Sequence, residues 1–224
     1  TFVDPRLPII GKKNPNLSVN PNNLWKGTVS GVPEQEQSDA DRGSSWLNTA
    51  VLARVDAPGS FMDYAEVQFI LAEASLRGLI SGGDSAAKDY YENGVTASVQ
   101  KWAEHGQYSE IPVTVESSDI GALLESDLAS WDKATNKYEL IGNQKYLALF
   151  WIGMEAYHEY RRTGYPELTI GSGTVFNDYT LPTRFAYPTT TLATNSDNAE
   201  EAIARMGGNT MKTPVWWSQQ AIQG

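Results

Sequence analysis

Histidine and glutamate stand together at positions 158 and 159, which is how the zinc protease pattern His-Glu-x-x-His begins. In that pattern two histidines one helical turn apart hold the metal. The position four residues after His158 is Arg162, so the second ligand is missing and we reject a metalloprotease. His105 lies in a distant segment, where it suits a cation at the C-terminus of a helix. The chain has no cysteine and can form no thiolate site, so no metal or cofactor is predicted.

Two glutamates, Glu66 and Glu73, lie seven residues apart, a spacing that places both on one face of a helix. A glycosidase needs such a pair of carboxyl groups, but a sequence cannot show their separation. We instead predict that one or both meet Arg161 or Arg162 in a partly buried ion pair, because a planar guanidinium suits a carboxylate. The sequence also lacks the GxSxG, phosphate-binding, CxxC and dinucleotide motifs, and we predict that the protein is not an enzyme.

Two isolated tryptophans, Trp25 and Trp46, stand among amides, hydroxyls and glycine in a loop-like part of the sequence. An exposed ring in such surroundings can stack on a sugar or a peptide. A ring that anchors the loop against the core is the more common arrangement. Trp25, Trp46, Asn23 and Arg54 are therefore our candidate ligand-binding residues, chosen from local chemistry alone.

The composition limits the partners that these residues could meet. The 224 residues carry 17 Lys and Arg against 27 Asp and Glu, a formal net charge of −10 with a pI near 4.7. Such a charge argues against nucleic acid and against an anionic membrane surface. The chain begins without Met, signal segment or lipidation motif, which is typical of a mature protein or of a fragment.

The elements that position these residues are predicted to be helices. Residues 1–60 are rich in proline and asparagine and are expected to form loops. A first helix is predicted over residues 63–77, with Asp63 and Glu66 as an acidic capping box and a buried face of Val67, Ile70, Leu71 and Ala74. A second helix is predicted from Asp84, with a buried face of Ala87, Tyr91, Val95, Ser98, Val99 and Trp102. Small residues, Ala72, Ala74 and Gly94, allow the two helices to approach closely.

The apolar run from residue 146 to 157 predicts a long central helix over residues 138–161, buried on all sides and closing the pair. Gly164 can take the left-handed capping conformation, and Pro166 cannot continue the helix. A short helix is expected over residues 119–128, capped by Ser117 or Ser118, and a last helix over residues 198–206. Trp216 and Trp217 are expected to tuck back onto the body.

Several stretches, taken together, resemble the later half of the SusD/RagB family of Bacteroidetes. They are DPRLP (4–8), FMDYAEVQFILAEA (61–74), YYENGVTASVQKW (90–102), QKYLALFWIGMEAYHEYRRTGYP (144–166), RFAYP (184–188) and VWW (215–217). The resemblance implies a mainly α fold, an α-α superhelix of tetratricopeptide-like helix pairs with long irregular loops. Residues 1–224 would be the C-terminal portion of a SusD-like domain: a loop-rich segment (1–60), a helix pair (61–104), then the central helix and C-terminal loops (105–224).

The resemblance also implies a function. Members of this family are outer-membrane lipoproteins that bind oligosaccharides, or in some members peptides, and work with a SusC-like TonB-dependent transporter at the cell surface. The N-terminal lipid anchor would lie outside this chain. The matched motifs are scaffold, so the resemblance gives no binding role to Trp25, Trp46, Asn23 or Arg54. Two other functions remain open: a helical scaffold that binds only the transporter, and a glycoside hydrolase.

Overall fold

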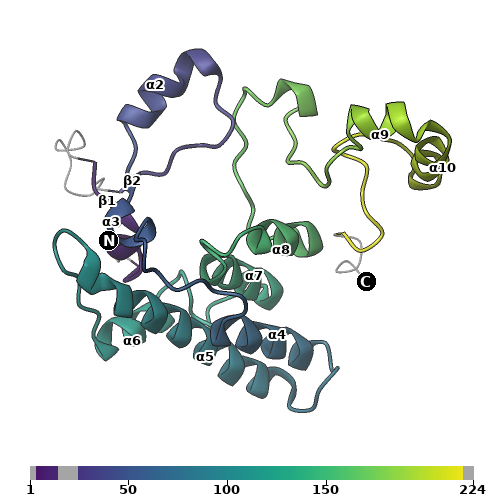
Figure 1. Cartoon of the computed structure of the whole chain (residues 1–224). Helices are drawn as coiled ribbons and strands as arrows, with labels where there is room; N and C mark the ends of the chain where they lie inside the picture. Colours follow the sequence, from purple (N-terminus) through teal and green to yellow (C-terminus); the bar gives the residue numbers. More distant parts are fainter. Residues whose placement is uncertain (1–3, 15–24, 219–224) are drawn as a thin grey trace.

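The structure is a computed structural model that describes residues 4–14 and 25–218 (Figure 1). The fold is mainly α, as predicted, with one two-stranded ribbon among the described residues. Within those residues no helix is long and apolar enough to cross a membrane. The elements are α1 (Leu7–Ile10), β1 (Gly11–Lys12), α2 (Glu34–Arg42), β2 (Trp46–Leu47), α3 (Thr49–Leu52), α4 (Tyr64–Leu76), α5 (Gly83–His105), η3 (Gly106–Tyr108), α6 (Ser117–Glu125), α7 (Lys137–Ala148), α8 (Glu155–Thr163), η4 (Val175–Asn177), α9 (Thr189–Thr194) and α10 (Ser196–Met206).

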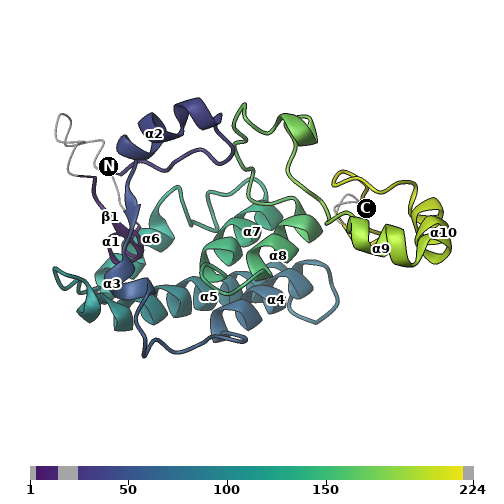
Figure 2. The same ribbon diagram turned by 45° about the horizontal axis from the view of Figure 1, so that its top comes forward.

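Helices α4 and α5 form the predicted hairpin, and α7 and α8 pack over it (Figure 2). The predicted face of α5 is confirmed, since all six of its expected side chains are buried. The helices approach closely at Gly94, where an added Cβ would lie 2.9 Å from the ring of Phe69. Helix α5 begins after Gly82, which takes a positive φ of 119°, and Asp84 is therefore inside the helix and is not its N-cap.

The predicted buried face of α4 is wrong. Ile70 is 42% exposed, and the buried side chains are Ala65, Glu66, Gln68, Phe69, Ala72 and Ser75. Helix α4 packs against both α5 and α7, so its buried surface is wider than one apolar stripe and includes polar groups. The capping box is also absent, because the Asp63 carboxylate binds Ser60 and Lys101 and does not cap the helix backbone.

The prediction of one long central helix is wrong as well, because two helices, α7 and α8, occupy these residues. Between them the chain turns at Trp151 and Gly153, which have φ angles of 69° and 48°. Leu147, Trp151 and Met154 are exposed, so the apolar run is not buried on all sides. Because nearly every residue of the run is apolar, its sequence does not show which side of a helix would face the core. Gly153 within the run permits the turn. The predicted end is confirmed: Gly164 has a φ of 79° and donates its N–H to the carbonyl of Tyr160.

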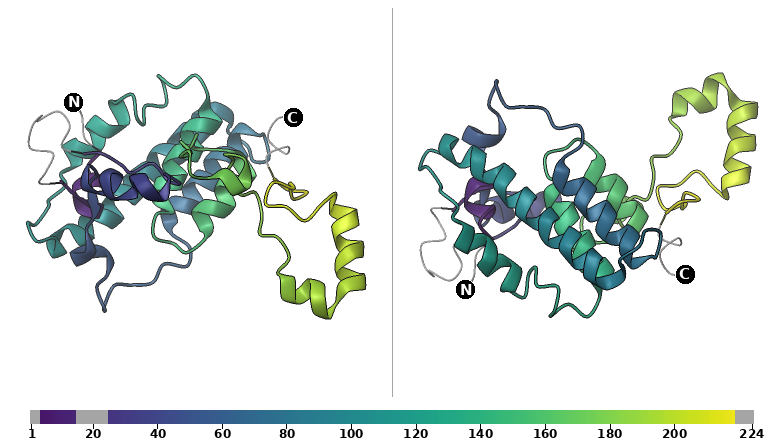
Figure 3. Two further views of the ribbon diagram at one scale, coloured as in Figure 1. Left: turned by 90° about the horizontal axis from the view of Figure 1, so that it is seen from above. Right: turned by 90° about the horizontal axis from the view of Figure 1, so that it is seen from below.

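The later helices follow the predictions in part. Helix α6 begins at Ser117, but Glu116 caps it in a reciprocal box with Asp119, so neither Ser117 nor Ser118 is the cap. Helix α10 ends at Gly207 in the left-handed conformation, as predicted. Helix α2 in the loop-rich segment and helix α9 were not expected. Helices α9 and α10 lie apart from the body (Figure 3).

The loop-rich start of the chain is tied to the body through backbone contacts. Strands β1 and β2 pair antiparallel, with Gly11 opposite Leu47. Farther along, Ser30 bridges to Ile170, and Gly171 and Gly173 donate their N–H groups to the carbonyls of Ser30 and Gly31, both at 2.8 Å. We call this contact between residues 30–33 and 170–174 the glycine seam.

Candidate functional site

Arg54 lines the larger of two clefts that contain our candidate residues, with a volume of about 580 Å³. The cleft lies between the segment that follows α3, the C-terminal end of α5 and the turn between α7 and α8. We call this site the Arg54 cleft, and its charged and aromatic residues are Arg54, Asp63, Lys101, Trp102, Glu104, His105, Phe150 and Trp151.

Two neighbours fix the Arg54 side chain. Its Cζ atom lies 3.2 Å from the centroid of the Tyr108 ring, a stacked arrangement that suits a planar guanidinium. Its Nε and Nη2 atoms meet the two carboxylate oxygens of Asp56 at 3.0 and 2.9 Å, and this contact lowers the pKa of Asp56. The Nη1 atom is buried and has no partner. Arg54 is thus held in position with one donor unused.

Aromatic rings form one wall of the Arg54 cleft. The centroids of Trp102 and Phe150 are 6.0 Å apart, and those of Phe150 and Trp151 are 5.9 Å apart. Trp102 is buried, whereas Trp151 is 58% exposed and has a positive φ. A bulky residue in the left-handed region is uncommon, and such strain persists only where the surrounding structure enforces it. The turn between α7 and α8 therefore presents a tryptophan ring to solvent at the edge of the cleft.

The Arg54 cleft contains both acidic and basic side chains. Asp63 forms an ion pair with Lys101 and accepts a hydrogen bond from Ser60. His105 lies between the Trp102 and Tyr108 rings, and burial, followed by the charges of Arg54 and Lys101, lowers its pKa. His105 does lie in the last turn of α5, as expected, but this lowered pKa opposes its charged form. Among the described residues no group of three or more His, Asp or Glu could hold a metal ion.

Trp25 lines the second cleft, which has a volume of about 390 Å³. Its ring covers Gly11, where an added Cβ would lie 3.2 Å from Cζ3 of Trp25. The Lys13 ammonium lies 5.9 Å from the centroid of the same ring. The polar residues of this site, which we call the Trp25 cleft, are Lys12, Lys13, Asn48, Ser109 and Glu110.

The structure does not bring the four candidate residues together. Trp46 is 51% exposed and lies opposite Lys12 in the ribbon, and neither cleft includes it. Because side chains alternate along a strand, Trp46 is on the ribbon face opposite to that of Gly11, which the Trp25 ring covers. Arg54 and Trp25 line separate clefts, and Asn23 lies outside the described residues. Hydrogen bonds between Lys26 and Ser45 place Trp25 and Trp46 on neighbouring segments, and a shared platform of the two rings stays a prediction.

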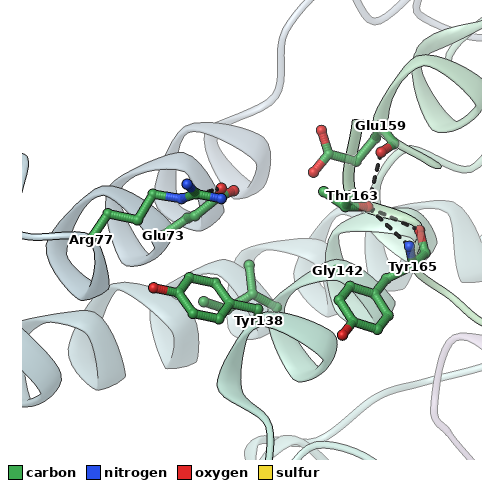
Figure 4. Close-up of a pocket in the computed structure, with 8 residues that line it drawn as sticks. Glu73, Arg77, Tyr138, Gly142, Glu159, Thr163 and Tyr165 are labelled. Atoms are coloured by element: carbon green, nitrogen blue, oxygen red, sulfur yellow. Dashed lines mark hydrogen bonds and ion pairs between the residues drawn. The ribbon is translucent and has the colours of Figure 1, made fainter. Parts of the chain in front are cut away.

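Glu73 and Arg162 lie elsewhere, in an ion pair that joins α4 to α8. Figure 4 shows Glu73 on α4 and Glu159 on α8. Arg162 meets Glu73 at 2.5 and 2.8 Å and Glu159 at 2.6 Å, and Lys145 meets Glu159 at 3.1 Å. Burial by itself would raise the pKa of Glu73 and of Glu159, but Arg162 outweighs it and holds both values below the usual range. The cavity beside this cluster is only about 10 Å³, room for one water. The cluster therefore joins helices and offers no ligand site.

Glu73 and Arg162 supply the predicted pairing of one glutamate with one of the two arginines, whereas Glu66 and Arg161 take no part in an ion pair within the described residues. Glu66 is 8% exposed and lies about 10 Å along α4 from Glu73, and burial raises its pKa. Arg161 lies on a different face of α8 from Arg162. Its guanidinium is stacked between the rings of Tyr157 and Trp217, at 4.5 Å from each, and donates to the carbonyl of Thr183. Trp217 thus packs on the body, whereas Trp216 is 94% exposed, so the prediction for Trp216 is wrong.

No sequence pattern marks Trp151, Lys101 or Asp63 as site residues. Trp151 lies within the apolar run and is indistinguishable there from a core residue. Gly153, two positions later, is the one local signal of a turn at that point. Lys101 is in α5 and Asp63 immediately precedes α4, and only the α4–α5 hairpin makes them neighbours.

Comparisons with known proteins agree with the architecture. The family model of SusD-like proteins, described as starch-binding and associating with the outer membrane, matches residues 1–188. A chitin-binding protein matches with 29% identity and a TM-score of 0.76, over 96% of this chain and 47% of that one. A SusD homologue from Bacteroides fragilis NCTC 9343 matches with 28% identity and a TM-score of 0.77, over 96% of this chain and 49% of that one.

A SusD homologue from Parabacteroides distasonis ATCC 8503 has 25% identity and a TM-score of 0.70, over 97% of this chain and 44% of that one. No curated protein matches the chain. The chain spans about half the length of these solved structures. Since the family model covers most of the sequence and the helical architecture is shared, the chain belongs to the SusD-like family.

Proposed function

We propose that the protein binds an oligosaccharide without modifying it, and that the Arg54 cleft is the binding site. The observation that carries the proposal is Trp151. Its backbone has a positive φ, and its exposed ring lies on the wall of a cleft of about 580 Å³. This volume is within the range of about 300 to 1,000 Å³ that small-molecule sites occupy. The family description and the name of the chitin-binding relative support a carbohydrate as the ligand.

The chemistry of the cleft suits a sugar. A pyranose presents C–H groups on one face and hydroxyls around its rim, so it pairs with a flat ring and nearby polar groups. Trp151 supplies the ring, and Arg54, Lys101 and Glu104 supply donors and acceptors around it. The Arg54 side chain lines the cleft in a position that its contacts with Tyr108 and Asp56 already fix. Fixed groups lose less entropy on binding than mobile ones.

The same groups argue against hydrolysis. A glycosidase needs one carboxyl group that donates a proton and a second that acts as base or nucleophile. The Asp63 carboxylate is engaged by Lys101 and Ser60 and is therefore not free to approach a glycosidic bond. Glu104 is the other carboxylate on the wall of the cleft. Recovery of intact oligosaccharide after incubation with the protein is the expected result.

The wider role follows the family. The protein is the C-terminal portion of an outer-membrane lipoprotein at the cell surface that passes its ligand to a SusC-like TonB-dependent transporter. Its loop-rich segment (1–60), helix pair (61–104) and the part of the remainder (105–224) that ends at residue 188 act as one binding body. The family description, association with the outer membrane, supports this role. Co-purification of the chain with such a transporter tests it.

Calorimetry with starch-derived and chitin-derived oligosaccharides tests the ligand and the site together. We expect Trp151→Gly to weaken binding about 30-fold, the effect of removing a central aromatic contact. Trp216→Gly is the matched control, because Trp216 is also exposed but is not part of the cleft. If no glycan of a broad array binds, the scaffold function that we left open replaces the proposal. If both variants bind as tightly as the parent, the Arg54 cleft is not the site.

A further inference from the structure

We infer that the Trp25 cleft is a second sugar site and that it takes a sugar unit bearing a carboxylate, such as a hexuronate. The inference goes beyond the proposed function, because it concerns another cleft and a ligand of defined charge. The cleft has a volume of about 390 Å³, and its polar walls are Lys12, Lys13, Asn48, Ser109 and Glu110.

The Trp25 ring supplies a stacking wall whose position is fixed by packing. One edge of the ring lies over Gly11, which is buried and has no side chain to push the ring away. Gly11 is held in turn by its pairing with Leu47 in the ribbon. The ring therefore leans on backbone, and the cleft opens beside it, which is the arrangement that a pyranose face requires.

The charge of the Trp25 cleft is positive in a chain of net charge −10. Lys12 is paired with Glu110 at 2.5 Å, so these two side chains cancel each other. Lys13 is exposed, and no acidic group pairs with it within the described residues. Its ammonium lies 5.9 Å from the Trp25 ring centroid, at the distance where a ring and a cation attract. A carboxylate on a sugar stacked against Trp25 would find an unpaired cation there.

Hydrogen-bonding groups below the ring are fixed as well. Asn48 is almost fully buried, and its Nδ2 atom donates to the carbonyl of Ile9 and to Oγ of Ser109, both at 2.9 Å. Because Ser109 Oγ accepts from Asn48, its own proton remains available to a sugar hydroxyl or carboxylate. Asn48 thus acts as a positioning residue for Ser109.

The two clefts are separate sites. Asn48, at the start of α3, lines the Trp25 cleft, whereas Val51 and Leu52 within α3 line the Arg54 cleft. The Arg54 cleft contains Asp63 and Glu104 besides its cations and does not favour an anion in this way. A long acidic glycan could occupy both sites, but a short one should distinguish between them.

Calorimetry with a galacturonic acid trimer and with the neutral galactose trimer of the same linkage tests the inference. The acidic trimer should bind more tightly, and its affinity should fall as salt is added, because the contact is between charges. Lys13→Gln should weaken the acidic trimer about fivefold and leave the neutral one unchanged. Lys133→Gln is the matched control, since Lys133 is an exposed lysine that lines neither cleft.

The outcomes separate this inference from the proposed function. Trp25→Leu should weaken the acidic trimer more than Trp46→Leu, and Trp151→Gly should not affect it. Lys13 makes no core contact, so its variant stays informative even if Trp25→Leu unfolds the protein. Equal affinity for the two trimers, or no effect of Lys13→Gln, overturns the inference. Loss of acidic binding in Trp151→Gly alone would instead assign the acidic sugar to the Arg54 cleft.

Discussion

At the scale of the residue, Trp151 combines strain with exposure. A non-glycine residue in the left-handed conformation costs about 1 to 2 kcal/mol relative to a helical one. Trp151 recovers little of this cost through burial, because more than half of its side chain is in contact with solvent. Stability alone would place a glycine at this position, so the ring is best explained by what it contacts when a ligand is present.

Replacing this residue should therefore separate stability from binding. We expect Trp151→Gly to raise the free energy of unfolding by about 1 kcal/mol, since glycine adopts this φ without strain. Trp151→Ala keeps the strain and should be no more stable than the parent. Thermal unfolding followed by circular dichroism compares the three proteins. A lower melting temperature for the glycine variant would show that the ring supports the fold.

Glu73, unlike the strained Trp151, stabilises the fold, because it forms an ion pair with Arg162. Removing the Glu73 charge leaves Arg162 with Glu159 as its only acidic partner among the described residues and weakens two charge-assisted hydrogen bonds, so Glu73→Gln should lower stability by about 2 kcal/mol at pH 7. The folded pKa of Glu73 is lowered, so its contribution is fully present above the unfolded value and is lost as pH falls through the folded one. Melting temperatures of parent and variant should converge in acid. A difference that persists at low pH would contradict the pairing.

Glu66 should affect stability with the opposite pH dependence to Glu73. Burial, opposed in part by Lys145, raises its pKa, so the ionised carboxylate destabilises the folded state above that value and the penalty disappears as pH falls. Glu66→Gln keeps the shape of the side chain and removes the charge. We expect a higher melting temperature than the parent at pH 8 and no difference at pH 4. A variant that is less stable at pH 8 would reveal a partner for the carboxylate.

At the scale of the element, the contact between α4 and α5 depends on one glycine. The Phe69 ring occupies the space that a side chain at Gly94 would need. Gly121 in α6 is a matched case without this constraint, because no atom lies within 4 Å of its added Cβ. The two glycines therefore separate helix propensity from packing.

We expect Gly94→Ala to lower the free energy of unfolding by about 1 to 2 kcal/mol, as overpacking outweighs the better helix propensity of alanine. Gly121→Ala should raise it by about 0.5 to 1 kcal/mol through propensity alone. Chemical denaturation of both variants provides the comparison. If Gly94→Ala is stabilising, the hairpin can separate without cost and the contact is looser than the structure indicates.

The same elements show what a sequence can predict. The face of α5 was correct because one side meets apolar neighbours and the other meets water, the situation that helical periodicity describes. In α4 the polar Glu66 and Gln68 are buried toward a second neighbour, α7, and periodicity fails. In the apolar run, Trp151 and Leu147 look like core residues, and only the turn at Gly153 exposes them.

The candidate sites were predictable only as single residues. Trp25 and Arg54 have the right chemistry and do line clefts, but their companions come from distant segments. Lys101 is in α5 and Trp151 follows α7, so no local pattern links either of them to Arg54. Trp46 resembles Trp25 in its sequence surroundings, but Trp46 is in strand β2 opposite Lys12, whereas Trp25 is outside the ribbon and its ring covers Gly11.

At the scale of the whole molecule, α9 and α10 form an arm (residues 189–206) that packs on itself. Among the described elements, α10 makes its main contact with α9. The two ends of the arm are joined below it, where the Tyr187 N–H donates to Oδ1 of Asn209 at 2.8 Å. The family model match also ends at residue 188, just before the arm. The body and its clefts should therefore not depend on residues 189–206.

Replacing residues 189–206 by a short glycine-serine linker tests this independence. The ends are close enough for the join, so we expect the melting temperature to change by less than about 4 °C, the shift that 1 kcal/mol gives in a domain of this size. Affinity at the Arg54 cleft should stay the same. A large loss of stability would show that the arm braces the body, and a loss of affinity alone would show that it contacts the ligand.

The glycine seam has a consequence for how this protein can diverge. The segments it joins, residues 30–33 and 170–174, are held by N–H and C=O groups and by glycines too close to tolerate a Cβ. A Cβ at Gly171 would lie 2.3 Å from the carbonyl oxygen of Gly31. Because the join is made of backbone, side chains elsewhere on these loops can be exchanged without undoing it. The scaffold can thus acquire new loop surfaces by mutation while the seam keeps them in place.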